Sequence, residues 1–69
     1  MSEIFNSSPA LLRRRDIESI TGLSRSTIYD LIKKGQFPKP IKLTARAVAW
    51  SRADVLAWVE KKLASAVPH

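Results

Sequence analysis

A chain of 69 residues allows one small domain, and its 12 basic and 6 acidic side chains give a net charge of +6. The lack of cysteine excludes a disulfide framework and a thiolate metal site, no apolar run is long enough to span a membrane, and the beginning MSEIFNSSPA lacks the pattern of a signal peptide. These properties favour a cytoplasmic protein with a polyanionic partner.

The first helix is predicted over Arg14 to Thr21, after a flexible tail at residues 1–10 in which NSSP is a loop signal. Ile17 and Ile20 give this short segment an apolar pair three residues apart, which is the spacing of one helix face.

A tight turn and a second helix follow. Gly22 stands where a helix ends in the left-handed conformation, and Ser24 is a typical N-cap residue. Apolar residues recur at helical spacing from Ile28 to Ile32, and Gly35 is expected to end the helix. Two short helices joined through a glycine turn predict a helix-turn-helix.

The stretch QFPKPIKLTARAVAWS predicts an extended passage and then a β-hairpin. Its two closely spaced prolines exclude helix. In IKL we expect Ile41 and Leu43 to point inward and Lys42 outward, and in AVAWS we expect Val48 and Trp50 to point inward. The residues TAR between the two strands are the predicted turn.

A third helix is predicted from about Arg52 to Ala64, capped by Ser51. Its expected apolar face comprises Val55, Leu56, Trp58, Val59 and Leu63. Trp50 and Trp58 are assigned to the core rather than to base stacking. The folded domain is therefore expected over residues 11–64, with a flexible end at residues 65–69.

Catalysis is not expected from this sequence, and no cofactor or metal is implied. The one histidine, His69, is the last residue, where it cannot be held in the geometry of a general base. Two glycines are too few for a glycine-rich phosphate loop, and no metal-ligand spacing occurs.

Binding to double-stranded DNA is indicated by the position of the basic residues. Between Asp30 and Asp54 the chain has six basic residues and no acidic one. Hydroxyl and basic side chains on the second helix are expected to face outward, toward the phosphates and the nucleobase edges of DNA. There Arg25 can bind a guanine edge or clamp a phosphate. The predicted contacts of the second helix are Ser24, Arg25, Ser26, Thr27, Tyr29, Asp30, Lys33 and Lys34. The predicted contacts of the hairpin are Lys39, Lys42, Thr44 and Arg46, and weaker contacts on the first helix are Arg14 and Arg15.

Two of these residues, Tyr29 and Asp30, have alternatives that the sequence leaves open. Tyr29 either lies along the sugar–phosphate chain or packs partly against the hairpin. Asp30 either accepts a hydrogen bond from a cytosine amino group or pairs with Lys33 or Lys34. Arg46 is the hairpin residue best suited to a narrow minor groove.

Four motifs together resemble the AlpA-like regulators of prophages, a family related to phage excisionases and to MerR-like winged-helix domains. They are TGLSRSTIY, G-x-FP-x-P-x-K-L, R-A-V-x-W and V-x-A-W, and the resemblance covers about Leu11 to Lys62. It implies a winged helix-turn-helix, mainly α with a small β-hairpin, in which Ser24 to Lys34 recognise DNA and about Ile41 to Trp50 form the wing.

The sequence therefore predicts a sequence-specific DNA-binding protein, with the second helix in the major groove and the wing on the backbone or in the minor groove. Regulation of prophage or mobile-element genes is the first interpretation. One alternative is an excisionase that bends DNA at an attachment site, and another is a basic protein-interaction module. Because one domain of this size contacts few base pairs, self-association or cooperative assembly on DNA is also expected.

Overall fold

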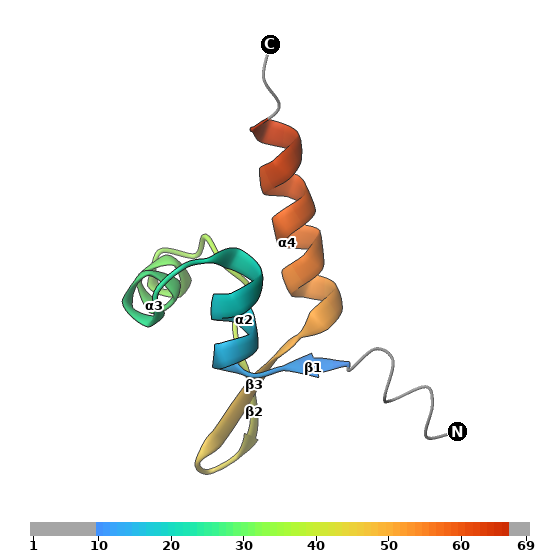
Figure 1. The fold of residues 1–69 in the computed structure, drawn as a ribbon. Coiled ribbons are helices and arrows are strands. Elements are labelled where there is room, and N and C mark those ends of the chain that lie inside the picture. The colour runs from blue at the N-terminus through green and yellow to red at the C-terminus, as the bar shows by residue number, and fades with distance from the viewer. Residues whose placement is uncertain (1–9, 67–69) are drawn as a thin grey trace, which may run out of the picture.

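A computed structural model describes residues 10–66 and shows three helices and three short strands (Figure 1). The elements, in chain order, are β1 (Leu11–Leu12), α2 (Arg14–Thr21), α3 (Arg25–Lys33), β2 (Ile41–Thr44), β3 (Ala47–Ser51) and α4 (Arg52–Ser65). The predicted winged helix-turn-helix is confirmed, with each helix beginning where the sequence indicated or within one residue of it. Of the flexible tail expected at residues 1–10 and the flexible end expected at residues 65–69, residues 1–9 and 67–69 lie outside the described residues, whereas Ser65 is the last residue of α4.

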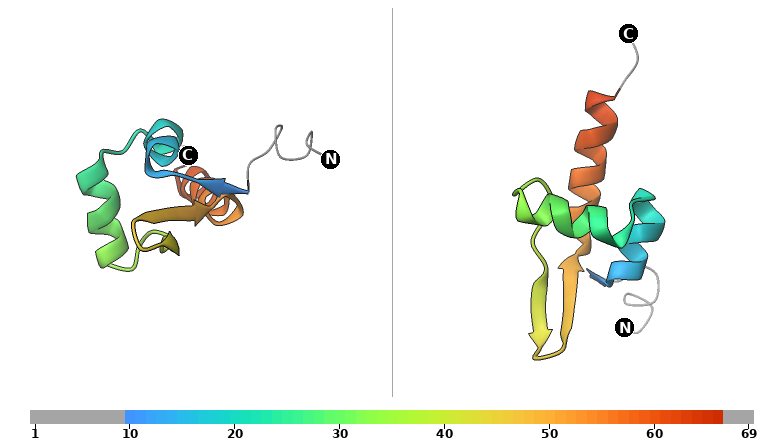
Figure 2. Two further views of the ribbon diagram at one scale, coloured as in Figure 1. Left: turned by 90° about the horizontal axis from the view of Figure 1, so that it is seen from below. Right: turned by 90° about the vertical axis from the view of Figure 1, so that its left-hand side faces the viewer.

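The hairpin and the last helix extend in opposite directions from the centre of the domain. Strands β2 and β3 form an arm on one side, and α4 projects on the other (Figure 1). Helices α2 and α3 lie beside this axis, and α3 runs across the direction of the arm (Figure 2). No helix within residues 10–66 is long and apolar enough to cross a membrane.

The sheet has the order β1-β3-β2, and both pairings are antiparallel. Leu11 pairs with Ser51, and Leu12 pairs with Trp50. The backbone N–H of Arg52 donates to the carbonyl of Ala10 at 2.9 Å, which extends this pairing by one bond. Strand β1 was not predicted from the sequence. It makes β3 the central strand and leaves β2 with an unpaired outer edge.

The hydrophobic core is small, and each helix and strand contributes only a few residues to it. Ile17 of α2, Ile28 of α3, Trp50 of β3 and Val55 of α4 are fully buried. The cluster is completed by Leu12 and Phe37, and the half-buried residues packed against it are Leu23, Leu31, Ile32, Val48 and Trp58. The inward positions predicted for Val48 and Trp50 are confirmed. A core this small makes each buried side chain important for stability.

The prediction that Ile41 and Leu43 point inward is wrong, because both side chains are 44% exposed. Paired residues of antiparallel strands share a face, so Ile41 lies on the face of Ala49, and Lys42 on that of Val48. Strand β2 belongs to a projecting arm and has no second layer over it (Figure 1). The alternation of apolar and basic residues in IKL therefore predicted the strand correctly. It did not predict which face of that strand is covered by other residues.

The apolar face predicted for α4 is covered only in part. Val55 is buried and Trp58 is half-buried, but Leu63 is 65% exposed, which corrects its assignment to the packed face. Ile20, the second member of the apolar pair on α2, is also 42% exposed. The carboxyl-terminal end of α4 projects beyond the other elements (Figure 1), and Leu63 and Ile20 line one open hollow there.

The two tryptophans hold the proline-containing segment against the core. The indole N–H of Trp50 donates to the carbonyl of Pro38 at 3.0 Å, and that of Trp58 donates to the carbonyl of Gln36 at 2.8 Å. The ring of Phe37 lies edge-to-face with Trp58, with centroids 4.8 Å apart. These contacts fix the path from α3 to the arm and confirm that both tryptophans are packing residues.

Candidate nucleic-acid interface

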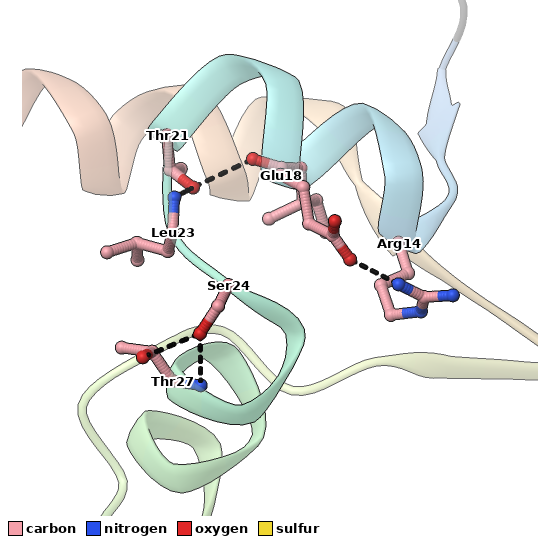
Figure 3. A network of polar contacts seen from close by, with 7 residues as sticks. Arg14, Glu18, Thr21, Leu23, Ser24 and Thr27 are labelled. Carbon is pink, nitrogen blue, oxygen red and sulfur yellow. Dashed lines mark hydrogen bonds and ion pairs between the residues drawn. The ribbon is translucent and has the colours of Figure 1, made fainter.

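The turn between α2 and α3 is held by local hydrogen bonds (Figure 3). Gly22 has a φ of 74°, and its N–H donates to the carbonyl of Glu18 at 2.8 Å. The hydroxyl of Thr21 accepts from the N–H of Leu23 at 3.1 Å and donates to the carbonyl of Ile17 at 2.8 Å. The turn is therefore a defined connection, and it fixes the angle at which α3 leaves α2.

The predicted N-cap of α3 is confirmed. The Ser24 hydroxyl accepts from the N–H of Thr27 at 3.3 Å, and the two side-chain oxygens are 2.9 Å apart (Figure 3). The N–H groups of Arg25 and Ser26 lie in the same first turn, where helical N–H groups have no intrahelical acceptor. All four residues are exposed. This end of α3 can therefore donate hydrogen bonds to an anion.

Arg25 is connected to the core through two aromatic rings. Its guanidinium carbon lies 5.9 Å from the centroid of the Tyr29 ring. That ring in turn meets Trp50 at an interplanar angle of 62°, with centroids 6.3 Å apart. Tyr29 is 39% exposed and Trp50 is fully buried, so the partial packing of Tyr29 against the hairpin is observed. Arg25 itself is exposed beside the Tyr29 ring, so its guanidinium N–H groups can donate to a bound partner.

Asp30 pairs with Lys34 rather than with Lys33. Its carboxylate lies 3.1 Å from the Lys34 ammonium, and the two side chains are 56% and 59% exposed. An exposed pair of this spacing contributes about 0.2–0.5 kcal/mol to stability, because water and salt screen it. The pair is therefore easily opened, and Lys33 remains exposed beside it.

The turn at the tip of the arm contains no glycine or asparagine, and a threonine side chain stabilises it instead. The Thr44 hydroxyl accepts from the backbone N–H of Arg46 at 3.2 Å. It keeps its own proton for donation to another acceptor. The pairing of β2 with β3 is irregular between Lys42 and Thr44, at the position expected for the bend of a wing. Lys39, Lys42, Thr44 and Arg46 are all exposed.

Helix α3 and Lys42 of the arm lie on one side of the hairpin. The ring of Tyr29 contacts Trp50, which places α3 over the face of β3 that carries that tryptophan. Val48 lies two residues away on the same face, and Lys42 is its partner on β2. The side chain of Lys42 is therefore on the side of the hairpin that α3 occupies.

The arginines of α2 differ from one another in their surroundings. Arg14 forms an ion pair with Glu18 and is partly buried (Figure 3). Arg15 is exposed, and so is Arg13, the N-cap residue of α2, which was not among the predicted contacts. The run of three arginines was visible in the sequence, but nothing local indicates that it lies beside Arg46. The structure brings them together around a hollow lined by Arg13, Arg14, Arg15, Arg46 and Val48.

A helix-turn-helix with an exposed, basic second helix, followed by a basic hairpin on the same side, defines the chain as a winged helix-turn-helix protein. Residues 10–66 bring together no three His, Cys, Asp or Glu side chains that would hold a metal ion.

Comparison with known proteins gives the family. Residues 10–63 match the family described as Prophage CP4-57 regulatory protein (AlpA). The chain therefore belongs to the AlpA family of prophage regulatory proteins, and the resemblance seen in its motifs is confirmed. It is also similar to the uncharacterized protein ORF88 of Enterobacteria phage P4, with 45% identity over 53 residues. That match covers 77% of this chain and 60% of the length of the phage protein. The family description is that of a prophage regulatory protein.

Proposed function

We propose that this protein binds double-stranded DNA sequence-specifically and regulates prophage or mobile-element genes. The observation that carries the proposal is the placement of α3 and Lys42 on the same side of the hairpin. A duplex lying against that side meets a helix and a basic strand together, which is the arrangement of a winged helix-turn-helix bound to DNA. Such a role is binding rather than catalysis, and it takes place with the DNA in the cytoplasm.

In the proposed complex α3 enters the major groove with its amino-terminal turn toward the DNA. Arg25 reads a guanine edge with two hydrogen bonds, for which the planar fork of N–H donors on its guanidinium is suited. Ser24, Ser26, Thr27 and Lys33 contact phosphates, and Lys42 and Thr44 of the wing contact the backbone. The contact predicted for Lys34 requires the pair with Asp30 to open.

Binding to duplexes at a series of salt concentrations tests the proposal. We expect the logarithm of affinity to fall linearly with the logarithm of salt concentration, with a slope of roughly −0.9 for each phosphate neutralised. Polyglutamate is the matched control, because a basic protein-interaction module would bind an acidic polypeptide as well as DNA. Absence of binding to any duplex at low salt would overturn the proposal.

Footprinting on the DNA of the host element separates regulation from recombination. A protected site at a promoter supports regulation. Tandem protected sites with strong bending beside an attachment site would instead assign the protein to excision, with the same DNA-binding surface.

A further inference from the structure

A hollow of about 280 Å³ lies between the start of α2 and the arm. Its lining is Arg13, Arg14, Arg15, Arg46 and Val48. Four of these five residues are arginines, and they come from two segments that only the fold brings together. We call the hollow and its four arginines the arginine cradle.

The positive charge of the cradle is only partly compensated. Arg14 pairs with Glu18 on its own helix. Asp16 is used at the start of α2, where its carboxylate accepts from the backbone N–H of Arg13 at 2.8 Å. Within residues 10–66 no acidic side chain forms an ion pair with Arg13, Arg15 or Arg46. Guanidinium groups gathered in this way repel one another, and an anion between them would remove that repulsion.

The chemistry of the lining specifies the class of anion. A guanidinium presents its N–H donors in a planar fork that matches the oxygens of phosphate, and several arginines lining one hollow can offer such forks to one tetrahedral anion. Val48 lines the hollow, so the cradle opens on the face of the hairpin that also carries Trp50 and Lys42, the β2 partner of Val48. This is the side against which the duplex is proposed to lie.

We propose that the arginine cradle holds one backbone phosphate of the bound duplex, with Arg13 and Arg15 on one side and Arg46 on the other. This inference rests on the proposed function and deepens it. It assigns Arg46 to the DNA backbone instead of the minor groove, and it adds Arg13 to the contact surface. A phosphate held from both sides also ties the arm to α2, so DNA binding fixes the angle of the wing.

The experiment is a scan of the duplex with single neutral methylphosphonate linkages, using the full chain. The variants are Arg15→Gln and Arg46→Gln, and the control is Lys61→Gln, which removes one charge from an exposed position on α4. Circular dichroism checks that each variant is folded. For the wild type we expect one methylphosphonate position to lower affinity by about tenfold, as loss of a charged hydrogen-bonded contact does.

The decisive comparison is between protein and DNA changes made together. We expect Arg15→Gln and Arg46→Gln each to lower affinity for the unmodified duplex, and to become insensitive to methylphosphonate at the same single position. Lys61→Gln should keep the wild-type sensitivity there. Insensitivity at two different positions, or undiminished sensitivity everywhere in both variants, would overturn the cradle while leaving duplex binding intact.

Two further outcomes distinguish a DNA phosphate from a free phosphate ion as the ligand, and failure of the cradle proposal from failure of the proposed function. Titration of the free protein with inorganic phosphate is followed by the NMR signals of the arginine side chains. If Arg46→Gln abolishes phosphate binding but leaves duplex affinity unchanged, the cradle binds a free anion and the DNA assignment is wrong. A wild type that binds no duplex at all overturns the proposed function, and the cradle's role on DNA with it.

Discussion

Helix α3 and the wing carry similar polar side chains, but the protein holds them in different ways. Helix α3 is anchored by the fully buried Ile28, capped by Ser24 and stacked through Tyr29 onto the core. Strand β2 of the wing is exposed along its whole length and is held by its pairing with β3. The helix is thus fixed in position, whereas the wing is supported along one edge.

This difference matches the two kinds of DNA contact in the proposed complex. Hydrogen bonds to base edges depend on exact placement of donors, and a fixed helix supplies it. Phosphate contacts carry no sequence information and tolerate small adjustments of the chain. We therefore expect specificity to depend on α3, and the affinity shared by all sequences to depend on the wing.

The largest expected effect is on stability, and it distinguishes a buried isoleucine of α3 from an exposed isoleucine of the wing. Ile28→Ala removes a fully buried side chain and should lower the free energy of unfolding by about 2–5 kcal/mol. Ile41→Ala, at a position that is 44% exposed, should cost less than about 1 kcal/mol. Urea unfolding of both variants measures the difference. Equal losses would show that the wing is packed as firmly as the helix.

The next effect is on recognition by α3. Arg25→Ala should weaken binding to the cognate site by about 1–3 kcal/mol and relax the preference at one base position. Tyr29→Leu, which removes the ring under the guanidinium, should reproduce part of this loss, and Tyr29→Phe should not. Affinities for cognate and random duplexes are compared. An equal loss on both would make Arg25 a phosphate contact and remove the contrast with the wing.

A smaller and uniform effect is expected from the wing. Lys42→Ala should lower affinity for all sequences alike and make the slope of log affinity against log salt shallower by about 0.9, which corresponds to one phosphate contact. Lys61→Ala on α4 is the control of equal charge and should leave the slope unchanged. An unaltered slope for Lys42→Ala would remove this residue from the interface.

The smallest effect should come from Asp30. Asp30→Asn removes a negative charge from α3 and frees Lys34, so affinity for random duplexes should rise about twofold, in line with the weak exposed pair. Anisotropy titrations with random and cognate duplexes measure the change. A loss confined to the cognate site would instead mean that Asp30 accepts a hydrogen bond from a base.

Features that depend on neighbouring residues were predictable from the sequence. The cap at Ser24, the left-handed end of α2 at Gly22 and the buried stripe containing Ile28 follow from side-chain chemistry within one or two turns. The structure confirms all three. The second helix of the helix-turn-helix could therefore be predicted from local sequence alone.

Features that depend on distant segments were not predictable in the same way. The pairing of Leu11 with Ser51 joins the two ends of the domain, and two residues carry no strand signal of their own. The exposure of Ile41 depends on the arm projecting from the helices, which alternation does not report. Likewise, the cradle exists because the fold places Arg13 and Arg15 near Arg46.

Selection of bound sequences from a pool of random duplexes tests most directly the claim that α3 reads bases. The wild type should enrich a short motif, repeated at a fixed spacing if several copies assemble together. Arg25→Ala should enrich the same motif with one position lost, and Lys42→Ala should keep every position. A wild type that binds the pool without enriching any sequence would contradict the account.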